Sequence, residues 1–283
     1  MKLKTITTLA VASLGISAAQ AATVTWQGGT GNWLGNANWD VGGAANQNVP
    51  DQTANDDNIV ISTGDITYNP GGDLGLNWGG SNLTLAGGSV TQTVTNWTRF
   101  TGSGTFMVSG GIFTTSSTNV QFGESSVDSA SLIITSGAFN HVGAGEFKVR
   151  NGNTVTVDGG SLSSRFFSIG DFGGSNIDLL SGSINLTDGS IGNNGIFTSG
   201  GSDSINFSTG STGVFHVGNI NVADATAAYL ASDKVRVNGD TNDALLQVIS
   251  DGAGGVNISV VPEPSSAALL GLGGLALILR RRK

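Results

Sequence analysis

One hydrophobic pattern recurs along the middle of the chain. It consists of an apolar residue, any residue, a second apolar residue, any residue, a small residue and a glycine. Six copies follow one another at intervals of 22 to 28 residues, beginning at Leu83, Phe106, Leu132, Val155, Ile177 and Ile205. The sixth place is glycine in every copy: Gly88, Gly111, Gly137, Gly160, Gly182 and Gly210. The spacing indicates a repeated structural unit.

Each copy predicts a short β-strand followed by a sharp turn. Alternating apolar residues give a strand one buried face, and a glycine after it permits a positive φ or a close approach of two backbones. A second short strand is expected before four of the copies, where the aromatic residues are Phe100, Phe122, Phe147 and Phe167. Each unit therefore holds two or three short strands and two turns.

A unit of this size cannot bury its apolar face alone. Stacked about 4.8 Å apart, successive units bury a continuous column of Leu, Ile, Val and Phe. We therefore expect an all-β fold, a parallel β-helix (β-solenoid) with caps at both ends. The alternative is a β-sandwich, in which the same strands pair as antiparallel hairpins. The regular spacing by whole units favours the β-helix.

The flanking segments are expected to close the ends of the stack. The predicted parts are an N-terminal cap with first strands at 22–80, the solenoid repeats at 81–219 and a C-terminal cap at 220–260. Trp26, Trp33 and Trp39 can cover the open strand edges of the first coil. Alternatively, exposed tryptophans stack on sugar rings.

The C-terminal cap is expected to mix helix and strand. Residues 223 to 233 have the composition of a short helix. The segments near 234 to 237, 245 to 249 and 256 to 261 are rich in β-branched and apolar residues, so we expect three strands there.

The first 21 residues have the three parts of a secretory signal peptide. Lys2 and Lys4 form a basic start, and residues 6 to 16 are mostly apolar. Ala19 and Ala21 are the small residues that a signal peptidase requires. Cleavage after Ala21 leaves Ala22 as the first residue of the mature chain, and makes the secretion machinery an expected partner.

Residues 261–283 also have three parts. The first, Val261-Pro262-Glu263-Pro264-Ser265, stays extended because its prolines disfavour a helix. Residues 267 to 279 are apolar and span about 20 Å as a helix, which is short for a bilayer. A basic cluster that favours the cytoplasmic side follows: Arg280, Arg281, Arg282 and Lys283. We expect a short C-terminal transmembrane helix, and the alternative is a helix in the core of the fold.

These three parts, in this order, resemble the PEP-CTERM sorting domain. The resemblance implies recognition by an exosortase, a membrane-embedded transpeptidase-like cysteine protease that processes the chain near the Pro-Glu-Pro motif. It implies an inner-membrane anchor before processing, and afterwards a place at the cell surface or in an exopolysaccharide matrix. Residues 80 to 215 also resemble the autotransporter-associated β-strand repeat.

The composition of the chain excludes cysteine-based sites and disfavours nucleic acid as a partner. Cysteine is absent, so the chain has neither a disulfide nor a thiolate metal site. Residues 22 to 261 contain nineteen acids and six bases, a net charge of −13. Such a surface repels nucleic acid, because phosphate recognition needs clustered Lys and Arg. We therefore expect no nucleic-acid partner.

Residues that could support catalysis or bind a metal are few. His141 and His216 lie about three repeats apart, which favours neither a histidine metal site nor a serine triad. Carbohydrate-cleaving β-helices use acidic clusters, but Asp158 and Asp188 each precede a glycine, where Asp more often forms a turn. The charged residues in neighbouring repeats are Asp171, Asp178, Lys148, Arg150 and Arg165.

Calcium is a further possibility, because residues 173 to 178 partly resemble the turns of calcium-binding β-rolls. They lack the tandem repetition that those sites require. We expect no metal and no cofactor. The function predicted from the sequence is that of a non-catalytic structural or adhesive protein of the cell surface or extracellular matrix, associated with exopolysaccharide. The alternative is a polysaccharide lyase or hydrolase on a β-helix scaffold.

The signal peptide gives a direct test at the N-terminus. N-terminal sequencing of the exported protein is expected to begin at Ala22, because signal peptidase cleaves after small residues. A chain that still begins at Met1 would contradict the assignment.

Overall fold

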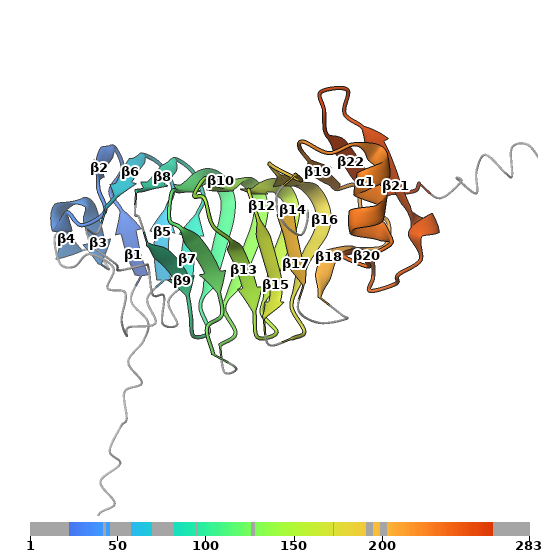
Figure 1. The fold of residues 1–283 in the computed structure, drawn as a ribbon. Coiled ribbons are helices and arrows are strands. Elements are labelled where there is room, and N and C mark those ends of the chain that lie inside the picture. The colour runs from blue at the N-terminus through green and yellow to red at the C-terminus, as the bar shows by residue number, and fades with distance from the viewer. Residues whose placement is uncertain are drawn as a thin grey trace, which may run out of the picture.

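The computed structural model describes residues 23–41, 44–45, 58–69, 82–93, 96–125, 128–171, 173–190, 195–198 and 203–262. Most of these residues form β-strands that wind in successive coils around one axis (Figure 1). The described strands lie on three faces; five coils have a strand on all three, and neighbouring coils pair strand to strand. The result is a β-solenoid of about five turns.

The first face is a ladder of parallel strands. Its strands, in order along the axis, are β1 (Thr23–Trp26), β5 (Asn58–Ile61), β7 (Asn82–Leu85), the first halves of β10 (Thr105–Thr115), β12 (Ser131–His141), β14 (Thr154–Ser164) and β16 (Asn176–Leu186), then β18 (Ser204–Phe207) and β20 (Val235–Val237). Each long strand turns a corner at its glycines, where the register shifts, and continues onto the second face.

The strands of the second and third faces also pair in parallel. On the second face, the strands in order along the axis are β2 (Thr30–Asn32), β6 (Asp65–Tyr68), β8 (Ser89–Gln92), the second halves of the four long strands, and β19 (Val214–Val217). The third face is a separate five-stranded sheet of β9 (Trp97–Phe100), β11 (Asn119–Phe122), β13 (Phe147–Arg150), β15 (Phe167–Asp171) and β17 (Ile196–Thr198).

The predicted parallel β-solenoid is confirmed, and the antiparallel sandwich is wrong for these strands. Leu83 pairs with Phe106, and the same ladder joins the first residues of all six predicted copies. It also continues to Ile59 and Val24, where the sequences IVISTG and VTWQGG carry the same pattern. The sequence pattern predicts six copies starting at Leu83, and the structure adds these two before them.

The corner glycines are required because adjacent coils approach closely. Gly137 and Gly182 have φ values of +76° and +81°, a region that favours glycine. A Cβ atom on Gly137 would collide with the carbonyl oxygen of Gly111 in the preceding coil, and one on Gly182 with that of Gly160. At these two positions glycine is therefore required by the contact between coils as well as by the turn, whereas at Gly210 only the positive φ requires it.

The core consists of columns of inward-facing side chains. Phe100 and Phe122 stack with ring centroids 4.3 Å apart, and Phe113 and Phe139 stack at 4.9 Å. Phe147 meets Phe167 edge to face at 5.7 Å. Full burial of each such side chain contributes roughly 1.5 to 3 kcal/mol, so the columns supply much of the stabilisation that a single coil lacks.

Three tryptophans close the N-terminal end. Trp39 packs edge to face against Trp26 and Trp33, at 5.0 and 4.8 Å, and donates its indole N–H to the carbonyl of Trp33 at 2.7 Å. Strand β3 (Trp39–Val41) pairs antiparallel with β1 and with β4 (Ala44–Ala45). All three rings are buried, so the alternative in which they stack on sugars fails for these three residues.

The C-terminal cap reverses the chain direction. Helix α1 (Val222–Ala225) runs into the π-helical turn η3 (Thr226–Leu230), and a 3-10 turn, η4 (Asp243–Leu245), precedes β21 (Leu246–Ser250). Strand β22 (Val256–Val260) pairs antiparallel with β19 and β21, which ends the parallel ladder. The predicted short helix and the three predicted strands are confirmed.

The corner glycines give a test of the contact between coils. We expect Gly137→Ala to lower the unfolding free energy by about 2 to 4 kcal/mol, from left-handed backbone strain and overpacking. Gly152 has the same φ of +76° but no atom near its Cβ position, so Gly152→Ala is expected to cost only about 1 kcal/mol. Urea unfolding of both variants measures the difference, and equal losses would contradict the proposed collision.

Candidate functional sites

The acids considered as catalytic residues make separate, local contacts. Asp158 accepts a hydrogen bond from Ser181 Oγ at 2.8 Å, and Asp178 accepts one from Asn206 Nδ2 at 2.9 Å, in both cases from the next coil. Asp188 accepts from Ser190 N and Oγ and lies 3.7 Å from Arg165. The side chain of Asp171 lies outside the described residues. Asp158 and Asp178 therefore link neighbouring coils, and Asp188 stabilises a turn.

Asp188 has the electrostatics of a turn residue. Hydrogen bonds from the Ser190 side chain and backbone lower the pKa of its carboxyl group. A general acid in a glycosidase requires the opposite shift, because it must hold a proton near neutral pH. This residue is therefore ionised and suited to ordering its loop.

The two histidines have different surroundings. His141 is buried, with Nδ1 3.0 Å from Ser164 Oγ and Nε2 2.9 Å from the Ser117 carbonyl, and burial lowers its pKa. His216, on β19, lies 3.0 Å from Asp251 Oδ2 in the turn between β21 and β22. Among the described residues, no three His, Asp or Glu side chains form a metal site.

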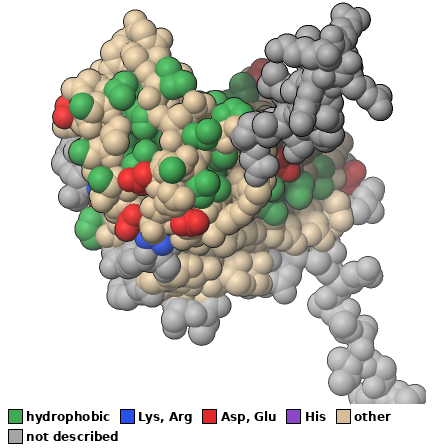
Figure 2. Space-filling view, turned by 90° about the vertical axis from the view of Figure 1, so that its right-hand side faces the viewer, with side chains coloured by type: hydrophobic (Ala, Val, Ile, Leu, Met, Phe, Trp, Pro, Cys, Tyr) green, Lys and Arg blue, Asp and Glu red, His purple; other side chains and the backbone are tan. Residues whose placement is uncertain are grey.

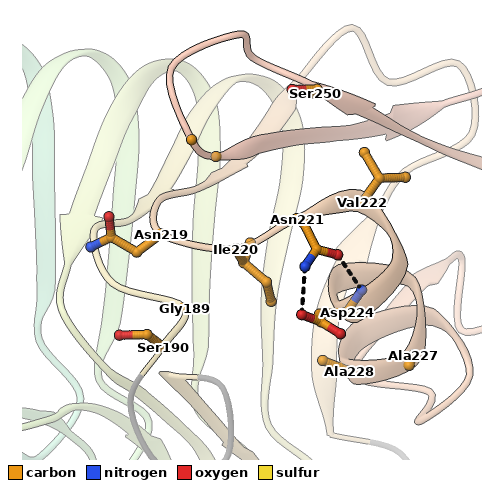
Figure 3. A pocket seen from close by; sticks show the side chains of 12 residues that line it. Gly189, Ser190, Asn219, Ile220, Asn221, Val222, Asp224, Ala227, Ala228 and Ser250 are labelled. Atoms are coloured by element: carbon orange, nitrogen blue, oxygen red, sulfur yellow. Dashed lines mark hydrogen bonds between the residues drawn. The ribbon is translucent and has the colours of Figure 1, made fainter.

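A cleft of about 950 Å³ separates the last coil from the cap. Ile220 lies at its centre in Figure 3, with Ser190 and Asn219 toward the coil and Asn221 and Asp224 on the helix side. The Asp224 carboxylate accepts from Asn221 Nδ2 at 2.6 Å, and Asp224 N donates to Asn221 Oδ1 at 2.9 Å. The described residues that line the cleft offer no acid and base pair.

The C-terminal segment leaves the fold directly from the cap. Val260 pairs with Leu246, and the Val261 N–H still donates to the Leu245 carbonyl at 2.9 Å. The Val261 side chain is 41% exposed. Hydrophobic side chains, with acidic ones between them, are spread over this end of the molecule (Figure 2). No spacer therefore separates the last strand from Pro262.

Most of the predicted terminal signals lie outside the described residues. These are Ala19, Ala21 and Ala22 of the signal peptide, and Glu263, Pro264, Ser265, the apolar stretch 267 to 279 and the basic cluster Arg280, Arg281, Arg282 and Lys283. Of the sorting motif, the structure describes Val261 and Pro262. Within the described part of the chain, no helix has the length and hydropathy needed to cross a membrane.

Comparison with known proteins supports the C-terminal signal. Residues 260–283 match the family model of the PEP-CTERM protein-sorting motif. The chain carries a PEP-CTERM sorting signal. The signal indicates export, processing by an exosortase-type enzyme and a cell-surface or extracellular destination. No curated protein and no solved structure matches the chain, and the resemblance of the repeats to autotransporter-associated repeats stays a prediction.

The sorting signal is thus attached to a folded end that His216 and Asp251 hold together. Asp251 also accepts backbone N–H groups from Ala253 and Gly255, at 2.7 and 2.8 Å. The hydrogen bond from His216 is the largest cause that lowers the pKa of Asp251, from 3.8 to about 2. Because the pKa of Asp251 is lower in the folded state than in the unfolded state, its charged carboxylate stabilises the fold at pH values above the unfolded-state pKa. This contribution is lost as the pH falls toward 2.

We therefore expect Asp251→Asn to lower the thermal unfolding midpoint by a few degrees at about pH 5, where the wild-type carboxylate is charged in both states. The difference should shrink steadily as the pH falls to about 2. Asp243→Asn, which changes an exposed aspartate of the same cap, serves as the control. Calorimetry at several pH values makes the measurement, and a difference that does not change with pH would contradict this role of the charge.

Proposed function

We propose that this protein is a non-catalytic structural or adhesive element of the cell surface or extracellular matrix, exported through a signal peptide and associated with exopolysaccharide. The observation that carries the proposal is the PEP-CTERM sorting signal at the end of an elongated β-solenoid. In this proposal an apolar helix holds the chain in the inner membrane until an exosortase-type enzyme processes it. The solenoid is the part that remains displayed.

The outer surface of the second face supports a matrix role. Thr67, Thr91, Thr114, Asn140, Ser163 and Asn185 follow one another as register partners on successive coils. The row is roughly 24 Å long at about 4.8 Å per coil. Hydroxyl and amide groups in such a row can donate and accept hydrogen bonds to hydrated glycans. They also keep the face polar without adding to the acidic charge.

The contacts of the described acids support a scaffold role. Here Asp158 and Asp178 bond to Ser181 and Asn206 of the next coil, and these contacts stabilise the stacking. We therefore propose that the charged residues of the solenoid serve the fold.

Processing is tested by the intact mass of the native protein from cell-surface and culture fractions. We expect a species that begins at Ala22 and ends between Pro262 and Pro264, with or without an added lipid. The double variant Pro262→Ala, Pro264→Ala is expected to keep Lys283, because its motif no longer stays extended. Ser266→Ala, just past the motif, is the control. A wild-type protein that retains Lys283 would contradict processing.

The non-catalytic role is tested separately. The purified protein, incubated with the producing strain's exopolysaccharide, is expected to release no new reducing ends and no unsaturated sugars. Turnover that disappears in Asp158→Asn or Asp188→Asn would instead establish the enzyme. Matrix association is measured by fractionating cells, and a wild-type protein absent from the matrix fraction would refute that part of the proposal.

A further inference from the structure

A groove of about 850 Å³ lies at the point where the sorting signal leaves the fold. It is lined by the end of β22 together with Val261 and Pro262, the first two residues of the sorting motif. Two turns also line it, one at 209–214 between β18 and β19 and one at 237–240 after β20. We call this groove the exit groove. The sorting motif therefore begins inside a feature of the folded cap.

The exit groove opens where β22 stops pairing with β19. These two strands lie side by side at the right of Figure 1, and their pairing runs only from Val256 to Ile258. On its other edge, β22 stays paired with β21 through Val260, and the Val261 N–H donates to the Leu245 carbonyl. Backbone groups of an antiparallel strand alternate between its two edges. The N–H and C=O groups of Val260 therefore point to the edge that β19 has left.

That edge is free for another strand. Among the described residues, no strand pairs with Val260 on the side away from β21. An unpaired strand edge is a template for an extended peptide, which adds to the sheet through backbone hydrogen bonds. The exit groove thus offers the backbone groups that a strand-like partner needs.

Hydrogen bonds hold the two turns of the groove in place. Ser211 Oγ donates to the Leu179 carbonyl of the preceding coil at 2.8 Å. Thr209 N–H donates to Asn238 Oδ1 at 3.1 Å, which joins one turn to the other. The groove is therefore preformed, and a partner that occupies it does not have to order these turns first.

The exit groove is accessible and nearly uncharged. Its exposed lining residues are Thr209, Gly210, Thr212, Asn238, Asp240, Val261 and Pro262. Asp240 is the only charged residue among the described residues of the lining, and the others are glycine, apolar residues or residues with hydroxyl or amide groups. Such a lining suits an extended, uncharged peptide that packs apolar side chains beside its backbone hydrogen bonds.

The sorting motif brings one particular partner to this groove. The signal indicates processing by an exosortase-type enzyme. An extended chain spans at most about 3.6 Å per residue, so Pro264 lies within roughly 7 Å of Pro262. An enzyme that acts on the motif between these prolines therefore reaches the cap. The exit groove is continuous with the segment that this enzyme binds.

We propose that the exit groove is a docking surface for the exosortase-type enzyme, and that an extended, uncharged segment of the enzyme pairs with the free edge of β22 at Val260. Strand pairing supplies affinity, and the exposed side chains of the groove supply specificity. Docking beside the motif holds the bond to be cleaved in a fixed position relative to the catalytic groups. The enzyme thus recognises the folded cap in addition to the C-terminal signal.

This inference rests on the proposed processing and adds a recognition surface to it. The test follows the conversion of the full-length chain in the producing strain by pulse labelling and intact mass. Thr212→Trp fills the groove from an exposed lining position and leaves the motif unchanged. We expect its processing to be at least about tenfold slower than that of the wild type, which corresponds to about 1.4 kcal/mol.

Thr91→Trp is the matched control. Thr91 is also exposed, but it lies on β8 of the second face, near the opposite end of the solenoid. This variant is expected to be processed at the wild-type rate. Circular dichroism and the thermal midpoint of each purified variant establish that it is folded.

A spacer variant tests the same surface without changing the groove. A flexible Gly/Ser segment of about six residues is inserted between Val260 and Val261, which keeps the five-residue motif intact. The link between groove and motif is then flexible, so docking no longer fixes the position of the motif and acts only through an effective concentration. We expect processing to slow by several fold. If Thr212→Trp does not fold, this variant decides the question.

Two results would overturn the proposal: processing of folded Thr212→Trp at the wild-type rate, or processing of the spacer variant as fast as the wild type or faster. Faster processing would show that the cap obstructs the enzyme. A wild-type protein that keeps Lys283 is a different result, because it refutes the processing on which the inference rests. Normal processing of the wild type and of both variants would refute the docking surface alone.

Discussion

The structure depends on the contact between one coil and the next. Backbone hydrogen bonds set the coils about 4.8 Å apart, and at the corners this spacing leaves no room for a Cβ atom on Gly137 or Gly182. The same spacing stacks Phe100 on Phe122 and Phe113 on Phe139 inside the solenoid. The repeat in the sequence therefore reflects the contact between coils, which recurs at Gly88, Gly137 and Gly182.

A stack of coils has two ends, and the chain closes them by different means. At the N-terminal end, Trp26, Trp33 and Trp39 pack together, and the strand that begins with Trp39 runs antiparallel to β1. At the other end, β22 reverses direction against β19, so that no further parallel strand can follow it in that ladder. The sorting signal starts in this last strand, which couples the closed end of the fold to the part of the chain that is processed.

The outward positions carry the differences between the faces. On the second face, register partners from Thr67 to Asn185 are uncharged, whereas the third face holds paired charges around Trp97. The charged residues of greatest interest as catalysts, Asp158 and Asp188, are engaged by serine side chains in turns or between coils. The faces of the solenoid therefore differ in their outward side chains, while the inward side chains are mostly apolar throughout.

The sequence by itself determined the repeat, its strands and the sorting signal, because each depends on residues close together in the chain. Leu83 to Gly88 predicts a strand and corner without any knowledge of its neighbours, and the copies at Val24 and Ile59 could have been found by the same rule. The outward rows required the tertiary structure. Loops of unequal length separate the strands, so the alignment of Arg99, Gln121 and Lys148 is fixed only when the coils pair. The tertiary structure also shows that Trp39 and His141 are buried, whereas Trp97 and His216 are partly exposed. Residues of the same type differ in this way because the backbone directs some side chains into the core and others outward.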